Sequence, residues 1–384
     1  MTDSLVSTAR TLVPLLREEA PQADADRRLT SRSATALREA GLFRLAVPRS
    51  VGGHGSTMRS YLSVTTELGK GCAAAAWVTT ILAGGAFVAA SFPDAVREEL
   101  WGTNPDTTIC LSTATPDAAA RGTDGGFVVN GKWHYASGCY QADWAVLAVP
   151  SVDESGKNVG RAFALIPIAE LTIQDTWQVA GMRGTGSNTL VAQDVFVPDH
   201  HLLSWAALLA GAGADEPLYR TPLSSILALT LLGPMLGLTK AAYEIVLETA
   251  KKKPMSLSLY QRLADSPSVQ LAIADAANLI DTAEFHIFRS TDDLDHANQQ
   301  DVRLEMPAWA RVRMDAAYAA MRLREALELL LNVSGAGTFA DANPLQRLWR
   351  DLEAATRHAS VNINLNREVY GRALLEVDET AQQI

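Results

Sequence analysis

Apolar side chains recur at helical spacing through the first 92 residues of the chain. Leu5, Ala9, Leu12 and Leu16 share one helical face. Glycines and a proline interrupt this pattern between residues 41 and 55, and alanine-rich helical segments then follow at 61–68, 72–90 and 93–101. The pattern predicts an N-terminal helical domain over residues 1–106.

From about residue 107 the pattern changes to alternation. Because short strands with turn residues and no helices between them are typical of antiparallel sandwiches and barrels, we expect a central β-domain over residues 107–201. An Asn130-Gly131 pair predicts a tight hairpin turn, after which Trp133, Tyr135 and Ser137 are expected to share one strand face. The predicted strands are residues 108–115, 127–129, 133–137, 145–149, 161–167, 171–177 and 190–197.

The helical period returns at about residue 202 and continues to the end of the chain. Long helices are predicted at 268–295 and 308–333, followed by a glycine-containing break and a last helix at 344–375. The apolar run 223–238 is short for a membrane span, so we expect a buried helix there. The fold class is therefore mainly α with a central antiparallel β-domain, and residues 202–384 form a helical bundle.

Composition narrows the classes of function. A chain of 384 residues with 48% hydrophobic and 20% charged residues is typical of a globular protein. Its net charge of −10 argues against a nucleic-acid partner and against an anionic membrane surface. Three widely spaced cysteines without a metal-ligand pattern fit a reducing compartment, and the first residues contain no signal-peptide pattern, so we expect a cytoplasmic protein.

Four motifs in a fixed order carry a family resemblance. They are residues 41–43 with 47–48 and 52–53, GKWHYASG at 131–138, GMRGTGS at 181–187 with DVFVP at 194–198, and NPLQRLWRD at 343–351 with His358 and Tyr370-Gly371. In these motifs the chain resembles the acyl-CoA dehydrogenase superfamily, and within it the two-component flavin-dependent monooxygenases. The resemblance covers nearly the whole chain and implies an N-terminal helical domain, a β-sandwich or barrel and a C-terminal bundle.

The resemblance implies a reaction as well. Reduced FMN or FAD, supplied by a separate reductase, would combine with O2 to a C4a-hydroperoxyflavin that hydroxylates an aromatic (phenol, indole or polyketide-like) or amine substrate. A homotetramer or dimer is implied because a loop of one subunit meets the flavin of the next. An acyl-CoA dehydrogenase is the alternative: residues 337–341 lack the glutamate such enzymes use as base, but Glu325 and Glu328 keep that chemistry open. A scaffold without catalysis is the third hypothesis.

Several residues acquire expected roles from the resemblance. Ser137 is expected beside the flavin N5 as a catalytic residue, with Tyr135 as its neighbour on the strand. Ser112 and Thr113 are expected to contact the flavin from the preceding strand, which lacks the acidic residue that dehydrogenases place before the proline at Pro116. For the flavin phosphate the candidates are Arg183, the lysine cluster 251–253, and the loop residues Ser334, Gly335, Gly337 and Thr338.

His358 is the histidine expected to be catalytic, removing a proton from a phenol, an amine or an indole nitrogen. Asp351 stands seven positions earlier, so both side chains are expected on one face of the last helix, and an unperturbed pKa would suit proton exchange near neutrality. His134 is expected to point away from Ser137 and to be structural. His200 and His201 follow a proline without a carboxylate at ligand spacing, so no metal is assigned to them.

A departure from the monooxygenase pattern concerns the helix after Trp77. Many relatives place a histidine there, whereas this chain has the small run 83–86, Ala-Gly-Gly-Ala. Because small side chains leave space, we expect a larger pocket or a substrate other than a simple phenol.

Overall fold

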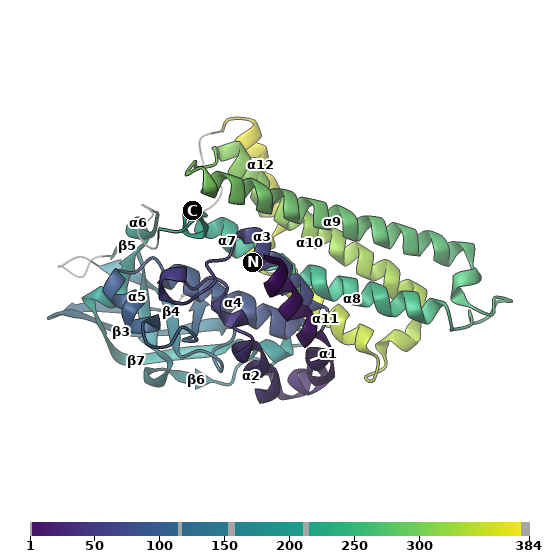
Figure 1. The fold of residues 1–384 in the computed structure, drawn as a ribbon, viewed down its shortest axis with the longest axis horizontal. Coiled ribbons are helices and arrows are strands. Elements are labelled where there is room, and N and C mark those ends of the chain that lie inside the picture. The colour runs from purple at the N-terminus through teal and green to yellow at the C-terminus, as the bar shows by residue number, and fades with distance from the viewer. Residues whose placement is uncertain (1, 114–116, 153–157, 210–214, 378–384) are drawn as a thin grey trace.

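The strand-rich middle segment lies at one end of the molecule beside the N-terminal helices, and the long C-terminal helices extend away from it (Figure 1). The computed structural model describes residues 2–113, 117–152, 158–209 and 215–377. Thr30 caps the second helix and Thr57 the third, each accepting a hydrogen bond from the backbone three residues on. The first helices, as predicted, are α1 Thr2–Asp26, α2 Ser31–Glu39, α3 Met58–Gly69, α4 Ala73–Ala89 and α5 Asp94–Trp101, with short 3-10 turns η1 Leu42–Arg44 and η2 Arg49–Val51 in the predicted loop.

Two four-stranded sheets form the middle segment, with strand orders β1-β4-β5-β8 and β2-β3-β7-β6. Every pair is antiparallel except β1 and β4, which run parallel. The expected antiparallel β-region is therefore confirmed with one parallel pair added. The strands are β1 Ile109–Ser112, β2 Ala119–Thr123, β3 Gly126–Ala136, β4 Trp144–Val152, β5 Asn158–Pro167, β6 Thr172–Gln174, β7 Asn188–Pro198 and β8 Leu202–Ser204.

The predicted hairpin turn at Asn130-Gly131 is wrong. Strand β3 runs through both residues, and the chain turns earlier, where Gly125 has a φ of 73°. The side chain of Asn130 instead exchanges hydrogen bonds with Asp194 across the β3–β7 pair, at 3.0 and 2.9 Å. Asp194 has a φ of 51° and the register shifts at this point, so the Asn-Gly pair faces a β-bulge of the neighbouring strand.

A second bulge overturns the expected face shared by Trp133, Tyr135 and Ser137. The register shifts between Trp133 and Ala136, because β3 carries one extra residue there, and Tyr135 takes a φ of 61°. Trp133 is fully buried, whereas the side chain of Tyr135 is 67% exposed. The bulge therefore separates the two rings and ends the strand with Ser137 turned inward.

The long C-terminal helices pack against α3, and the first short helix of this segment packs against β5 and β8. The two long predicted helices and the break after them are confirmed. The helices are α6 Trp205–Leu209, α7 Leu223–Leu229, α8 Leu232–Ala250, α9 Pro267–Gln299, α10 Met306–Ser334, α11 Pro344–Ala355 and α12 Ile363–Leu374, and the 3-10 turns of the strand and bundle segments are η3 Ile168–Glu170, η4 Arg183–Thr185, η5 Asp199–His201, η6 Pro217–Arg220, η7 Leu263–Asp265, η8 Ala336–Phe339 and η9 Ala359–Val361.

The single last helix predicted over residues 344–375 is wrong. Helix α11 ends at Ala355, and the turn η9 separates it from α12. Asn362 begins α12, because its side chain accepts hydrogen bonds from the backbone of Asn364 and Leu365. His358 lies between the helices as the residue that precedes η9.

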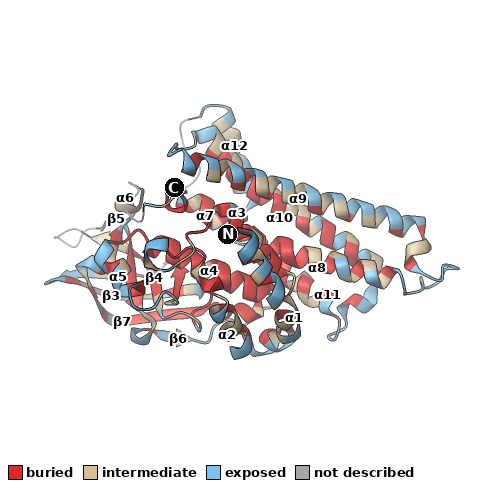
Figure 2. Cartoon of the chain, viewed as in Figure 1, coloured by how far each residue is buried: buried red, intermediate tan, exposed pale blue. Residues whose placement is uncertain are grey.

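The apolar run 223–238 forms α7 and the first part of α8. By length and composition Leu223–Ala250 is apolar enough to cross a membrane, but 89% of its most apolar window is buried inside the protein. It is therefore a core helix segment, as the sequence predicted (Figure 2).

One hydrophobic core connects the N-terminal helices, the sheets and the bundle. Helix α4 lies at its centre, between β1 and the helices α3 and α8. Gly85 makes this possible, because a Cβ at that position would lie 2.1 Å from the carbonyl oxygen of Ile109. The close contact sets one wall of a pocket between α4 and the end of β3. The domain ranges 1–106, 107–201 and 202–384 stay a prediction.

Candidate active site

A pocket of about 550 Å³ lies where α4, the end of β3, the α7–α8 junction and η9 meet. Five expected site residues line it together: Ser112, Thr113, Tyr135, Ser137 and His358. Sequence reasoning did not assign the other polar and aromatic residues of the wall to the site, among them Trp77, Thr80, Trp177, Thr185, Ser187 and Thr230.

Ser137 begins a chain of buried hydroxyl groups. Its Oγ accepts a hydrogen bond from Trp77 Nε1 at 3.2 Å and lies 2.6 Å from Ser187 Oγ. Ser187 Oγ lies 2.6 Å from the hydroxyl of Thr185, which donates to the carbonyl of Met182 at 2.8 Å. Because Thr185 donates its single proton to Met182, each hydroxyl before it donates along the chain. The free lone pair of Ser137 can then accept one more hydrogen bond.

His134 lines the same pocket, contrary to the expectation that it points away. The bulge at Tyr135 is the reason, since it breaks the alternation on which that expectation depended. His134 Nδ1 lies 2.9 Å from Thr189 Oγ1, and the carbonyl oxygen of His134 accepts from Ser112 Oγ at 2.9 Å. Ser112 therefore fastens β1 to β3 at the pocket wall.

Two aromatic rings stand at the pocket beside the bulge. Tyr135 and Trp177 meet edge to face with ring centroids 6.1 Å apart. Trp177 Nε1 donates to the carbonyl of Met182 at 3.0 Å, which fixes the indole ring. The hydrogen-bonded Trp177 therefore supports the ring of Tyr135, whose exposed face is available to a planar ligand.

His358 lies on the opposite wall and meets Trp77 edge to face, with ring centroids 6.0 Å apart. Its accessible surface faces the pocket, and burial by the surrounding protein lowers the pKa of its imidazole to about 4. The expected unperturbed pKa is therefore wrong, and the ring is neutral at pH 7. Nδ1 accepts a hydrogen bond from the backbone N–H of Ser360 at 3.2 Å, which assigns the ring proton to Nε2.

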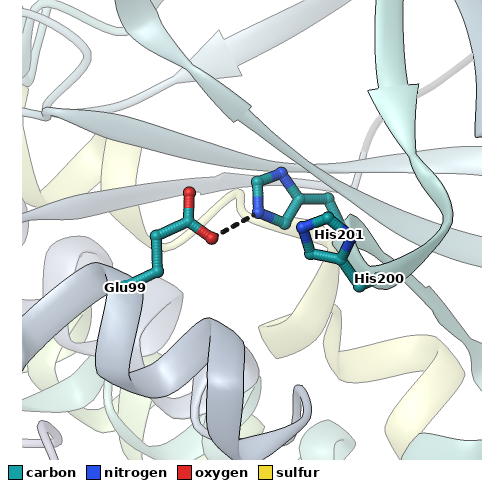
Figure 3. A group of neighbouring side chains, drawn as sticks. All are labelled: Glu99, His200 and His201. Carbon is teal, nitrogen blue, oxygen red and sulfur yellow. Dashed lines mark hydrogen bonds and ion pairs between the residues drawn. The ribbon is translucent and has the colours of Figure 1, made fainter.

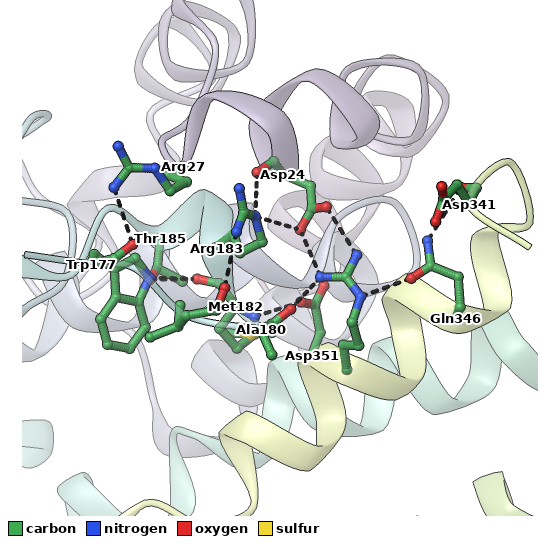
Figure 4. A network of polar contacts seen from close by, with 12 residues as sticks. Asp24, Arg27, Trp177, Ala180, Met182, Arg183, Thr185, Asp341, Gln346 and Asp351 are labelled. Atoms are coloured by element: carbon green, nitrogen blue, oxygen red, sulfur yellow. Dashed lines mark hydrogen bonds and ion pairs between the residues drawn. The ribbon is translucent and has the colours of Figure 1, made fainter. Parts of the chain in front are cut away.

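Asp351 does not accompany His358, because the helix on which both were expected ends between them. Asp351 is buried on α11, and its Oδ1 accepts from the backbone N–H of Met182 at 2.6 Å (Figure 4). Burial raises the pKa of its carboxyl group to about 7. The residue fastens the turn after residue 181 to α11 and does not line the pocket.

Arg183 stands outside the pocket, in the same network (Figure 4). Its Nε donates to the carbonyl of Asp24 at 2.9 Å and its Nη1 to that of Val179 at 3.0 Å. The carboxylate of Asp24 also binds Arg350 Nη2 at 2.9 Å. These contacts give Arg183 a structural role in tying α1 to η4.

The loop expected to hold the flavin phosphate, Ser334 to Thr338, does not line the pocket either. Lys253 reaches it, with Nζ donating to the carbonyl of Ser334 at 2.7 Å, whereas Lys251 and Lys252 pair with Glu248. The hydroxyl oxygens of Ser334 and Thr338 are buried and find no hydrogen-bond partner among the described residues. A cofactor site at this loop, if it forms, is thus separate from the pocket of the same subunit.

The small run after Trp77 contributes space as expected. Gly84 lines the pocket, and a Cβ there would meet only Leu111 Cδ2, at 3.9 Å. Room for at least a methyl group therefore lies beside this helix turn.

No aspartate or glutamate is among the described residues that line the pocket. Glu325, a possible dehydrogenase base, pairs with Arg322 on its own helix. Neither Glu325 nor Glu328 lies at the pocket wall. The position opposite Ser137 belongs to His358.

The histidine pair that follows Pro198 does have a carboxylate neighbour, contrary to the sequence expectation. Glu99 on α5 places its Oε2 2.8 Å from His201 Nε2, and the ligand atoms of Glu99, His200 and His201 lie within 4.8 Å of one another (Figure 3). The carboxylate comes from 102 positions earlier, which sequence spacing does not reveal. The cluster fastens α5 to η5 outside the pocket.

Comparison with known proteins identifies the class. The fold is that of acyl-CoA dehydrogenases: the family model of the acyl-CoA dehydrogenase N-terminal domain matches residues 4–98, and that of the C-terminal domain matches residues 229–363. Within this class, the chain belongs to the family of flavin-dependent monooxygenase oxygenase components.

Three relatives carry this assignment. The oxygenase subunit HsaA of Rhodococcus jostii is 33% identical over 94% of this chain and 95% of its own length. The FADH2-dependent resorcinol hydroxylase oxygenase component of a Rhizobium strain is 30% identical over 98% and 95%. The structure of XiaF from a Streptomyces, in complex with FADH2 and glycerol, superposes with a TM-score of 0.94 at 32% identity and covers 100% of this chain and 98% of that one.

The expected fold, the enzyme class and the flavin cofactor are confirmed at the level of this family. Oxygenase components of such two-component systems work with a separate flavin reductase, as expected.

Proposed function

We propose that this chain hydroxylates an aromatic substrate, a phenol or an indole, with O2 and with reduced FMN or FAD from a separate reductase. The observation that carries the proposal is the pocket in which His358 faces Ser137 with no carboxylate in the described wall. A dehydrogenase needs a carboxylate base, and an amine substrate, protonated at neutral pH, needs an anionic partner. A neutral aromatic ring needs neither.

The residues of the pocket fit a planar flavin ring. Tyr135 and Trp177 offer an aromatic edge, and Ser137 lies where the strand ends in Gly138, which has a φ of 75°. When bound, the reduced flavin supplies the two electrons with which one atom of O2 enters the substrate and the other leaves as water. Ser112 and Thr113 would line the same ring from β1.

Ser137 would hold the proton on the flavin N5. Reduced flavin carries an N–H at N5, and the direction of the hydroxyl chain leaves Ser137 Oγ with a lone pair to accept it. Trp77 fixes that oxygen from the other side. This chemistry requires that water be kept from the reacting centre, and Ser137 itself is only 5% exposed.

His358 would bind the substrate oxygen. With Nδ1 occupied by the Ser360 N–H, Nε2 carries the proton and donates it to a phenol or phenolate oxygen. A phenolate is the electron-rich form that attacks an electrophilic oxygen, so a donor that stabilises the phenolate favours hydroxylation. Accepting a proton from the substrate requires that the Ser360 contact opens first.

In this proposal the flavin phosphate site forms only when subunits assemble. Ser334, Gly335, Gly337 and Thr338 would meet the flavin of a neighbouring subunit in a homotetramer or dimer, with Lys253 beside them. The two unpartnered hydroxyls of this loop support a ligand there. Arg183 is bound to α1 and is a weaker candidate. The cytoplasm is the proposed location.

Two experiments, one aerobic and one anaerobic, test the function. Chemically reduced FMN or FAD, mixed with the protein, ¹⁸O2 and a panel of phenols and indoles, should give a hydroxylated product that carries one labelled oxygen. Acyl-CoA thioesters, mixed anaerobically with the protein and oxidised flavin, should leave the flavin absorbance unchanged. Bleaching of the flavin by a thioester, with no labelled product, would establish the dehydrogenase alternative instead.

A further inference from the structure

A second cavity, of about 660 Å³, adjoins the pocket that contains His358. Thr113, Leu227, Ala359 and Ser360 line both, so the two spaces share a wall made of the end of β1, helix α7 and turn η9. Aromatic rings from three elements contribute to the second cavity: Phe163, Trp205 and Trp309. A molecule that passes the shared wall would therefore enter an apolar, aromatic space.

Arg313 brings a buried positive charge to this cavity. Its side chain lies on α10, and the residue is only 4% exposed. The guanidinium stands over the ring of Trp309 at 5.4 Å, and its Nε donates to Asn366 Oδ1 at 3.0 Å. Among the described residues no carboxylate lies within ion-pair distance, and nothing accepts a hydrogen bond from its terminal nitrogens.

An uncompensated buried cation is costly, which makes its position informative. Burial lowers the pKa of Arg313, as expected for a charge removed from water without a counter-ion. The described residues that line the cavity include no aspartate or glutamate that could balance the charge of Arg313. In a chain of net charge −10, a buried guanidinium without a counter-ion favours a negative ligand.

The position of Arg313 is linked to that of His358. Asn366, which holds the guanidinium, also donates from Nδ2 to the carbonyls of Ser360 at 3.1 Å and Asn362 at 2.8 Å. Ser360 in turn donates its backbone N–H to His358. One short network thus fixes the histidine of the first pocket relative to the cation of the second.

We propose that the second cavity binds the distal part of the substrate and that Arg313 binds a carboxylate there. The substrate class is then an elongated aromatic acid, with its ring at His358 and its acidic group beside Trp309 and Arg313. This inference rests on the proposed hydroxylase function and adds the part of the substrate that the reaction itself does not define.

A flavin phosphate has the same anionic chemistry and is the other possible source of the charge. Two observations favour the substrate. Three aromatic residues line the cavity, as suits a substrate with an aromatic ring. The loop with unpartnered buried hydroxyls at Ser334 and Thr338 does not line it and offers a separate phosphate site.

Binding in the absence of flavin tests the proposal without relying on catalysis. The probes are ω-(4-hydroxyphenyl)alkanoates of two to six methylene groups and their primary amides, measured by calorimetry on the purified protein. We expect at least one chain length at which the carboxylate binds about tenfold to a hundredfold more tightly than its amide, as a charge-assisted hydrogen bond gives. Arg313→Met should abolish this ratio, and Arg313→Lys should retain part of it.

Arg311→Met is the matched control, because Arg311 lies on the same helix but pairs with Asp293 and does not line the cavity. It should leave the carboxylate-to-amide ratio unchanged. Equal binding of acid and amide by the unmodified protein at every length would overturn the proposal. The proposal would also be overturned if Arg313→Met, shown by circular dichroism to be folded, keeps the carboxylate-to-amide ratio, whether or not the variant loses affinity for FMN. If the acids bind selectively but no labelled product forms, the hydroxylase function fails and the anion site stands.

Discussion

At the scale of single residues, the direction of each hydrogen bond decides what a side chain can offer a ligand. Ser137 donates toward Ser187 and accepts from Trp77, so it offers an acceptor. His358 accepts at Nδ1 and therefore offers a donor. Sequence reasoning chose both residues but expected His358 to accept a proton, whereas its Nε2 is a donor in the structure. A backbone contact within a turn and the desolvation of an imidazole depend on tertiary structure, so the sequence did not predict them.

The first prediction concerns the hydroxyl of Ser137. Ser137→Ala should keep the fold and the affinity for reduced flavin but raise peroxide release relative to hydroxylated product by about tenfold to a hundredfold, the effect of losing one buried hydrogen bond. Peroxide and product are quantified per reduced flavin supplied. Ser225→Ala is the control, because Ser225 is buried on α7 and its hydroxyl has no described partner. An unchanged ratio in Ser137→Ala would make the serine structural.

The second prediction separates the roles of His358. His358→Ala should leave flavin oxidation intact and lower product formation by about a hundredfold to a thousandfold, the effect of losing one donor to the developing charge. His358→Asn keeps a donor, so it should restore part of both the substrate affinity and the rate. Because burial holds the pKa of His358 at about 4, activity of the unmodified protein should show no ionisation of this group near pH 6.5. Full coupled turnover in His358→Ala would contradict the proposal.

At the scale of elements, periodicity found most helices and strands but failed where the backbone departs from its period. The two bulges of the β3–β7 pair depend on a positive φ at Tyr135 and at Asp194, and neither residue type alone predicts that conformation. The end of α11 also has no sequence signal, since no glycine or proline directly follows Ala355. The nearest signal is Asn362, the N-cap residue of α12, seven positions later. These irregular segments are the ones that bring His134, Tyr135 and His358 to the pocket.

Helix α4 gives the third prediction, from two adjacent glycines. A Cβ at Gly84 meets only Leu111 Cδ2, at 3.9 Å, so Gly84→Ala should raise the free energy of unfolding by up to about 1 kcal/mol through helix propensity. A Cβ at Gly85 meets the carbonyl oxygen of Ile109 at 2.1 Å, so Gly85→Ala should lower it by about 1–3 kcal/mol. Urea denaturation measures both. Equal effects of the two substitutions would refute the close contact between α4 and β1.

At the scale of the whole molecule, apolar surface is left where the helices end. Leu257 and Leu259, in the connection between α8 and α9, are almost fully exposed, and Phe339 in η8 is more than half exposed. Lys253, at the start of that connection, hydrogen-bonds the Ser334 loop. Exposed apolar side chains next to the proposed phosphate loop are consistent with a subunit interface there.

The fourth prediction tests that interface. Replacing Leu257 and Leu259 together by serine should shift sedimentation toward the monomer at micromolar concentration and weaken flavin binding with it. Val302→Ser is the control, because Val302 is exposed in the connection at the opposite end of α9. A monomeric unmodified protein that binds flavin would contradict both the interface and the shared phosphate site.

The fifth prediction concerns the pH dependence of stability, in which the buried Asp351 and His358, which is exposed at the pocket but desolvated by the protein around it, oppose each other. The pKa of His358 is lowered to about 4, below its ordinary 6.5, so between these values the unfolded chain binds a proton that the folded chain does not. Its contribution is therefore complete above pH 6.5 and is lost as the pH falls toward 4. The pKa of Asp351 is raised to about 7, so the folded chain retains a proton that the unfolded chain has released above 3.8. That contribution is lost as the pH rises.

Because the two slopes have opposite signs between pH 4 and 6.5, the contribution of each group is measured as the pH-dependent change in stability that its own removal causes. Relative to the unmodified protein, Asp351→Asn should gain stability steadily as the pH rises from 4.5 to 7.5, while its Oδ1 can still accept from Met182. His358→Gln should gain stability relative to the unmodified protein as the pH falls from 6.5 to 4.5. Urea unfolding midpoints at four pH values measure both differences. A constant difference from the unmodified protein in either variant would show that the corresponding group titrates alike in the folded and unfolded chains.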